Sequence, residues 1–131
     1  MYLLDSNTCI QFLNGSSGAI ERRLMGTKPS EIKLCSVVKA ELWYGAARSN
    51  HVAVVMSKLS AFFAPYESFP FDDTAAIEYG RIRGQLARAG TLIGPNDLMI
   101  AAIARGRGLT VVTHNTREFS RILGLSTEDW E

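Results

Sequence analysis

Short apolar runs alternate along this chain with longer segments that have helical periodicity, and this alternation is the strongest constraint on its fold. The runs cover residues 2–4, 32–35, 66–71 and 109–113, and polar residues that can start a helix follow most of them. Strands separated by helices favour a parallel sheet with helices on both of its faces. The sequence therefore predicts the α/β class.

Seven helical segments are expected between and after these strands. They are a short helix through Ile10 and Phe12 that ends at Asn14-Gly15, residues 20–25, residues 37–48 with Ser36 as the cap, residues 52–63, a helix from Asp72 to Gly90, residues 95–105, and a short helix within 114–123. The segment 95–105 is apolar all round, which predicts deep burial.

The length and composition predict one compact domain, residues 1–131, because 131 residues with 47% hydrophobic side chains can form one continuous core. The sequence has no basic leader and no apolar run near the ~20 residues that a membrane helix needs. We therefore expect a cytoplasmic protein. Cys9 and Cys35 lie in apolar contexts far from either histidine, so buried thiols are expected rather than a zinc site.

Three acidic residues lie where ordinary structural roles explain them only in part. Asp5 follows the first strand and can cap a helix, Glu41 lies at the margin of the apolar stripe of its helix, and Asp97 begins an otherwise apolar helix. In a parallel sheet, such element ends can converge at one edge. Carboxylates crowded together repel, and a hard cation such as Mg²⁺ or Mn²⁺ relieves that repulsion.

The residues after the last strand offer two ways to complete the acidic cluster. Asn115 can orient a water bound to metal, whereas Glu118 supplies a charge on a longer side chain. Thr113 and Asn115 can equally be ordinary loop caps. A metal ion held by such a cluster can activate water and stabilise charge on a phosphate, which is the chemistry of phosphodiester hydrolysis.

Basic residues are concentrated in one part of the chain although the net charge is only +1. Residues 75–121 contain seven arginines and three acids, a local charge of +4, and no lysine. Arginine has the best shape for phosphate, although solvated helix faces are an equally good explanation. The candidate contacts to the phosphates of a nucleic acid are Arg81, Arg83, Arg88, Arg105 and Arg117.

The motifs resemble those of the PIN-domain nucleases, and in particular the VapC-type toxins of bacterial toxin and antitoxin pairs. The matching stretches are Leu4-Asp5-Ser6-Asn7, Ser36 to Leu42 with Tyr44-Gly45-Ala46, Ile93 to Asp97 before Ile100-Ala101, Thr113 to Phe119, and Thr127 to Trp130. They keep their order along nearly the whole chain.

The resemblance implies a three-layer α/β/α fold with a central parallel sheet and an acidic site for Mg²⁺ or Mn²⁺. It makes Asp5 and Asp97 the principal metal ligands, joined by Glu41 directly or through water. Glu118 is expected in the outer part of the site, with supporting polar groups from Asn7, Thr113 and Asn115. Many relatives carry an aspartate in the last motif, so the number of metal ions stays open.

The resemblance also implies a function and partners. VapC-type proteins are endoribonucleases that arrest translation, and tRNA, including the initiator tRNA, is the expected substrate class. The expected partners are a VapB-like antitoxin that binds DNA and blocks the metal site, and a second copy of the chain in a homodimer. Four aromatic residues could serve these contacts or belong to the core: Trp43, Tyr44, Phe62 and Phe63.

Two other functions are compatible with the same residues. Asp5 after the first strand could be the nucleophile of an aspartyl-phosphate phosphotransfer domain with Thr113 as a phosphate contact. Asn7 replaces the second aspartate of haloacid-dehalogenase-like enzymes, however, and Asp72-Asp73 lies far from the first strand. The second alternative is a module that binds RNA or protein without catalysis, which the intact set of acids disfavours.

Overall fold

The computed structural model describes residues 1–131 and contains one five-stranded sheet in which all neighbouring strands run parallel. Its strands are β1 (Tyr2–Leu4), β2 (Ile32–Cys35), β3 (Glu67–Phe69), β4 (Thr110–Val112) and β5 (Thr127–Glu128). The order across the sheet is β3-β2-β1-β4-β5. The chain thus starts at the centre, builds one half of the sheet and then the other. Such a reversal opens a crevice beside the carboxyl end of the first strand.

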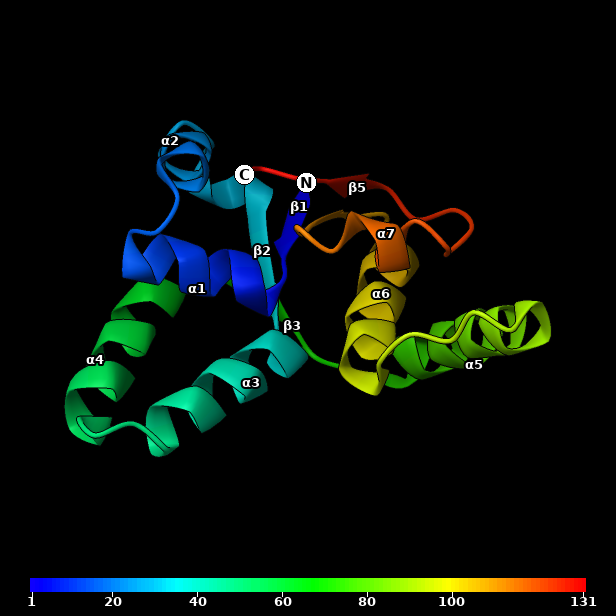
Figure 1. Cartoon of the computed structure of the whole chain (residues 1–131), viewed down its shortest axis with the longest axis horizontal. Helices are drawn as coiled ribbons and strands as arrows, with labels where there is room; N and C mark the ends of the chain where they lie inside the picture. The colour runs from blue at the N-terminus through cyan, green and yellow to red at the C-terminus, as the bar shows by residue number, and fades with distance from the viewer.

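Helices cover both faces of this sheet, as the sequence predicted. They are α1 (Ser6–Asn14), α2 (Gly18–Met25), the 3-10 turn η1 (Pro29–Glu31), α3 (Ser36–Ala47), α4 (Val52–Phe63), α5 (Asp73–Ala89), α6 (Pro95–Arg107) and α7 (Thr116–Phe119). In Figure 1, α1, α2 and α4 lie on one side of the strands, and α5, α6 and α7 lie on the other. The three-layer α/β/α prediction is confirmed. None of the helices combines the length and apolar character that crossing a bilayer would need.

Helix α6 is the most deeply buried helix, which confirms its predicted role in the core. Ile100, Ala101, Ala102 and Ala104 are 0% exposed, and they pack between the sheet and α5. The helix continues through Gly106 and ends at Arg107, two residues later than predicted, with Gly108 as its C-cap. Gly108 has a φ of 66°, a conformation that glycine adopts without the steric penalty of a Cβ atom.

The aromatic residues with two predicted roles divide between core and surface. Phe62 and Phe63 are buried, and Trp43 packs edge-on against Phe63 with 5.2 Å between ring centroids. Tyr44, the next residue of α3, is 67% exposed. Cys9 and Cys35 are both buried and free, as predicted.

Three local predictions differ from the structure. Strand β5 was not predicted, because a two-residue strand leaves no pattern in the sequence. The residues after it pack onto the fold through Trp130, whose ring centroid lies 5.1 Å from that of Tyr2. Strand β3 is shorter than the predicted residues 66–71. Ser36 is the first residue of α3 rather than its cap, which is Cys35.

The burial of α6 predicts which substitution destabilises the fold. Ile100→Ala should lower the free energy of unfolding by about 2–5 kcal/mol, because it leaves a cavity in a fully packed layer. Ile77→Ala is the matched control, since Ile77 lies on α5 and is 58% exposed; a change within about 0.5 kcal/mol is expected there. Urea unfolding followed by circular dichroism measures both. Equal losses in the two variants would contradict the assignment of α6 to the core.

Candidate metal centre

Asp5 stands at the point where β1 ends and α1 begins, and both of its carboxylate oxygens are used. Oδ1 accepts a hydrogen bond of 2.9 Å from the backbone N–H of Thr8, which makes Asp5 the N-cap of α1. Oδ2 accepts a bond of 2.6 Å from the hydroxyl of Thr113. The residue is only 6% exposed. The predicted capping role is therefore real, and it coexists with a position in the crevice beside β4.

Thr113 and the two residues that could complete the cluster form one chain of hydrogen bonds with Asp5. Thr113 directly follows β4 and is fully buried. Its hydroxyl accepts a bond of 2.9 Å from the backbone N–H of Asn115, whose side-chain amide donates to Glu118 Oε2 over 3.0 Å. Asn115 and Glu118 are thus paired rather than alternatives, and Asn115 orients the Glu118 carboxylate.

Asp97 lies in the first turn of α6, and its ionisation is strongly perturbed. Burial, followed by the negative charges of Asp5, Glu118 and Glu41, raises its pKa to about 6, while the Asn115 side chain opposes this rise. The charges of three other carboxylates can raise the pKa of a carboxyl group only when all four groups lie close together. The acidic residues that are distant in the sequence therefore do converge.

Glu41 contributes a carboxylate from α3. Its Oε1 atom is buried and has no hydrogen-bond partner, which is unusual for a charged oxygen. Burial raises the pKa of Glu41, and the charge of Asp5 adds to this effect. The side chains of Ser6 and Asn96 oppose the rise, so both belong to the polar surroundings of this carboxylate.

None of the four carboxylates forms an ion pair with a lysine, arginine or histidine. Burying uncompensated charge is costly, and a divalent cation with oxygen ligands compensates it directly. The orphaned Oε1 of Glu41 and the raised pKa of Asp97 both fit such an ion. The donor set is therefore suited to a metal such as Mg²⁺ or Mn²⁺.

The remaining predicted site residues are not drawn into this cluster. Asn7 is exposed in the first turn of α1 and makes no side-chain hydrogen bond. Ser6 and Asn96 take part instead, and sequence reasoning missed them. The signal that could have identified them was their place beside Asp5 and Asp97 in the same motifs.

The predicted arginine contacts fall into two groups. Three of them bind within the chain: Arg81 and Arg105 pair with Glu78, and Arg83 donates to the Tyr79 hydroxyl. Arg88 and Arg117 are exposed and have no such partner.

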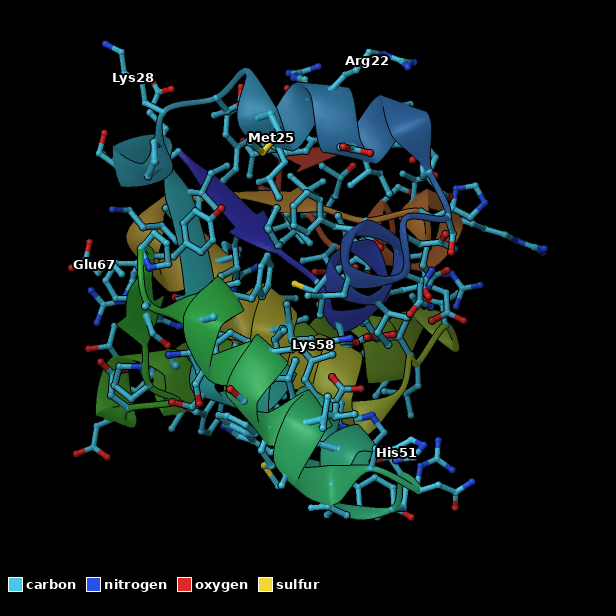
Figure 2. All side chains as sticks on the ribbon, turned by 90° about the vertical axis from the view of Figure 1, so that its left-hand side faces the viewer. Arg22, Met25, Lys28, His51, Lys58 and Glu67 are labelled. Atoms are coloured by element: carbon cyan, nitrogen blue, oxygen red, sulfur yellow. The ribbon has the colours of Figure 1, made fainter.

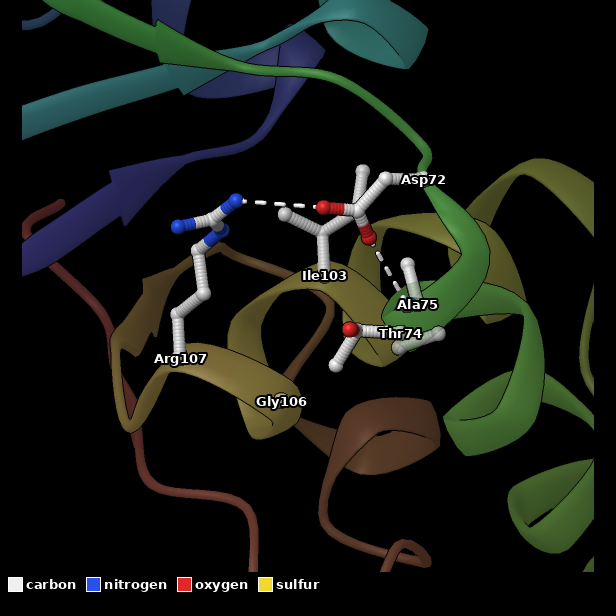
Figure 3. A pocket seen from close by; sticks show the side chains of 7 residues that line it. Asp72, Thr74, Ala75, Ile103, Gly106 and Arg107 are labelled. Atoms are coloured by element: carbon white, nitrogen blue, oxygen red, sulfur yellow. Dashed lines mark hydrogen bonds and ion pairs between the residues drawn. The ribbon is translucent and has the colours of Figure 1, made fainter.

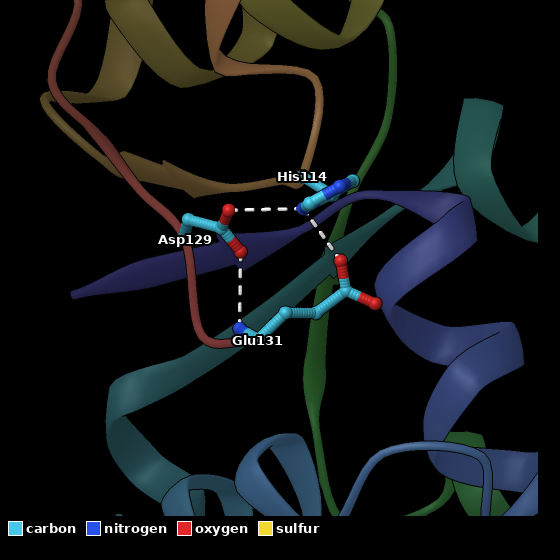
Figure 4. A group of neighbouring side chains, drawn as sticks. All are labelled: His114, Asp129 and Glu131. Carbon is cyan, nitrogen blue, oxygen red and sulfur yellow. Dashed lines mark hydrogen bonds and ion pairs between the residues drawn. The ribbon is translucent and has the colours of Figure 1, made fainter.

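Two other polar groups lie outside the centre and do not resemble it. His114, Asp129 and Glu131 form an exposed group in which the imidazole contacts both carboxylates (Figure 4). A hollow of about 130 Å³ between α5 and α6 contains Asp72 and Arg107, which pair with each other at 3.2 Å (Figure 3). Asp72 and Arg107 compensate each other's charge, and Asp129 and Glu131 both contact an imidazole, whereas the four carboxylates of the centre form no ion pair.

Comparison with known proteins identifies relatives over almost the whole chain. The profile of the PIN domain matches residues 2–125. The chain is 39% identical to the tRNA(fMet)-specific endonuclease VapC of Shigella flexneri and 41% identical to that of Salmonella typhimurium, in each case over 98% of this chain and 97% of the relative.

Solved structures agree with these sequences. A crystal structure of DNA-bound VapBC from Salmonella typhimurium matches with a TM-score of 0.93 and 41% identity. A structure of VapBC2 from Rickettsia felis, bound to a DNA fragment from its promoter, matches with a TM-score of 0.92 and 35% identity. Each match covers 99% of this chain and 98% of the other chain.

The raised pKa of Asp97 predicts how stability depends on pH without metal. The folded state holds a proton up to about pH 6, whereas the unfolded chain releases it near the ordinary aspartate pKa of 3.8. The free energy of unfolding should therefore fall as the pH rises from 4 to 6, by about 1–2 kcal/mol once screening of this half-exposed group is allowed for. Asp97→Asn should reduce this slope in urea titrations with EDTA, and Glu41, whose pKa burial also raises, accounts for a part that remains. An unchanged slope in the variant would contradict the assignment.

The hydrogen bond from Thr113 to Asp5 predicts an indirect effect on metal affinity. Thr113→Val should weaken binding of Mn²⁺ by about 10- to 100-fold, because Asp5 Oδ2 loses the donor that orients it. Thr113→Ser keeps the hydroxyl and should bind nearly as well as the original protein. Isothermal titration calorimetry measures both, and valine and serine variants of equal affinity would refute the role of the hydroxyl.

Proposed function

The chain belongs to the PIN-domain family and to its VapC-type endoribonucleases, the toxins of VapBC toxin–antitoxin systems, and we propose that it hydrolyses tRNA at the centre formed by Asp5, Glu41, Asp97 and Glu118. The observation that carries this proposal is the convergence of four carboxylates without a cationic side chain. The initiator tRNA is the proposed substrate, because two relatives of about 40% identity are named for it.

We further propose that residues 1–131 act as a single nuclease domain. A single hydrophobic cluster of 31 buried residues draws on both halves of the sheet and supports this proposal. The matched profile covers residues 2–125, and the remaining tail packs back onto β1 through Trp130.

PIN-family nucleases depend in general on a divalent metal, and we propose Mg²⁺ or Mn²⁺ for this chain. Asp5 and Asp97 are the proposed principal ligands, and Glu41 binds the ion directly or through water. Glu118 lies in the outer part of the centre, held by Asn115. All of these donors are carboxylate oxygens, the ligand type that both ions prefer.

A bound divalent ion supplies two effects here: it acidifies water and stabilises negative charge on the phosphate under attack. The protein prepares the site for both. Thr113 fixes the direction of the Asp5 carboxylate, and the Asp5 bond to Thr8 fixes it relative to α1. Glu41 Oε1, which has no partner in the protein, can accept a proton from an attacking water.

We propose that the RNA backbone contacts arginines from residues 75–121. Arg88 and Arg117 are the stronger candidates, because neither is engaged by a carboxylate of the chain. Arg81, Arg83 and Arg105 would have to exchange an intramolecular bond for a phosphate. Contacts of this kind weaken as salt rises.

The proposed partners follow from the relatives. Structures of VapBC complexes, two of them bound to DNA, match this chain closely, which supports a VapB-like antitoxin that binds DNA and inhibits the nuclease. We also propose a homodimer and a cytoplasmic location, where tRNA is available.

The alternative functions have less support. An aspartyl-phosphate mechanism needs an accessible nucleophile, whereas both oxygens of Asp5 accept hydrogen bonds and the residue is almost fully buried. A module that only binds RNA or protein would have no use for four crowded carboxylates, whose repulsion has a cost in stability.

The proposal is tested by removing one carboxylate charge. Asp97→Asn should reduce cleavage of an initiator tRNA transcript at least about 100-fold in Mg²⁺, because the ion loses a principal ligand. EDTA should stop the original protein, and restoring Mg²⁺ or Mn²⁺ should rescue it. Gel analysis of labelled RNA measures both effects.

Asp73→Asn is the matched control for this experiment. Asp73 also lies in the first turn of a helix, but it is exposed on α5 and outside the centre. Its cleavage rate should equal that of the original protein. Full activity of purified, folded Asp97→Asn, or activity that EDTA does not affect, would refute the proposed function.

A further inference from the structure

A hollow of about 640 Å³ begins at the carboxylate centre and extends between α1, α3 and α4. Ser6, Glu41 and Asn96 line the part that belongs to the centre. Arg48 and Lys58 line it as well, from the end of α3 and from α4. The volume is in the range of pockets that enclose a small ligand, about 300–1,000 Å³. The hollow therefore has an acidic part and a basic part.

Tyr44 is the aromatic residue at the mouth of this hollow. It lies one helical turn after Glu41 on α3, so the two side chains project from the same side of the helix. Tyr44 also lines a second, smaller hollow together with Glu41, Asn96 and Met99. Its ring is 67% exposed, whereas Phe62 and Phe63 are buried in the core. The ring contributes little to the core and is free to contact a ligand.

The two cations of the hollow are not neutralised by the protein. Neither Arg48 nor Lys58 forms an ion pair with a carboxylate. The guanidinium carbon of Arg48 lies 5.4 Å from the centre of the Tyr44 ring, a cation–π geometry that keeps the charge beside the aromatic surface. An aromatic ring next to free cations is the combination that binds single-stranded nucleic acid.

From these features we propose that the hollow binds an unpaired nucleotide next to the scissile bond, with its base stacked on Tyr44 and its phosphate held by Arg48 and Lys58. The proposal rests on the proposed function, because it assumes that RNA is the substrate. A phosphodiester at the carboxylates places the neighbouring nucleotide at the mouth of the hollow, where charge complementarity favours a phosphate. A base within a duplex cannot stack on the ring, so the site selects loops and single strands.

Fluorescence of a base analogue tests the stacking contact directly. The probe is a short single-stranded RNA that contains 2-aminopurine, mixed with full-length protein carrying Asp97→Asn so that the RNA stays intact. Stacking on Tyr44 should quench the fluorescence. Adding Tyr44→Ala should abolish the quenching and weaken affinity about 10- to 100-fold, whereas adding Tyr44→Phe should preserve both. When the same RNA is annealed to its complement, neither the Asp97→Asn protein nor its Tyr44 variants should quench the fluorescence.

The cations are tested by the salt dependence of affinity. Arg48→Gln and Lys58→Gln should each lower the slope of log affinity against log salt by about 0.7, the value for one phosphate contact on a single strand. Lys28→Gln is the matched control, since Lys28 is exposed at η1 near the edge of the face on which Lys58 lies (Figure 2). Ile77→Ala controls for loss of an exposed apolar side chain. Both controls should leave affinity and slope unchanged.

The outcomes separate this inference from the proposed function. If RNA is cut by the original protein but Tyr44→Ala changes neither quenching nor affinity, the nucleotide site is refuted and the cleavage stands. If the original protein cuts no RNA while quenching still depends on Tyr44, the cleavage is refuted and the nucleotide site stands. If Tyr44→Ala changes only the oligomeric state in size-exclusion chromatography, the surface is an interface between copies and the inference is overturned.

Discussion

The hydrogen bonds of the Asp5 carboxylate hold together the part of the molecule on which the rest depends. One oxygen caps α1, and the other accepts the hydroxyl proton of Thr113 at the end of β4. Two halves of the sheet, built from opposite ends of the chain, are thereby joined beside the central strand. The Thr113 hydroxyl also accepts a hydrogen bond from the backbone N–H of Asn115, and the Asn115 side chain donates to Glu118. The position of Glu118 is therefore linked to the same contact. The hydrogen bond from Thr113 to Asp5 thus stabilises the fold and also positions the carboxylates of the candidate metal centre.

The centre is electrostatically unfavourable in the protein alone, and the surrounding core holds it in place. Asp97 lies in the first turn of α6, and Leu98 and residues 100–104 that follow it are buried, so packing of α6 positions a carboxylate that its neighbours repel. Burial of the Glu41 carboxylate adds to this energetic cost. Proteins commonly accept such local costs where function requires them. A divalent cation would relieve the repulsion, which explains why the site needs no basic side chain of its own.

Most of the fold and the main acidic residues could be predicted because they follow from local patterns. Alternating strands and helices determine the layers, and the rule that ligands bind at the carboxyl ends of strands selects Asp5. Asp97 is selected by its place at the start of an otherwise apolar helix. Strand β5 could not be predicted, since two residues carry no periodicity and pair only because β4 offers a free edge. Ser6 and Asn96 were missed because their role depends on the position of Glu41. The exposure of Tyr44 beside half-buried Trp43 is likewise a result of tertiary packing.

The placement of β1 between β2 and β4 has a consequence for synthesis on the ribosome. Thr113, the hydrogen-bond partner of Asp5, lies 108 positions later in the chain. The bond between them can therefore form only after Thr113 has left the ribosome. A nascent chain, or a product of premature termination before β4, lacks both the neighbouring strand and the hydroxyl that orients the carboxylate. The chain must therefore be synthesised at least as far as Thr113 before the four carboxylates can adopt the arrangement described above.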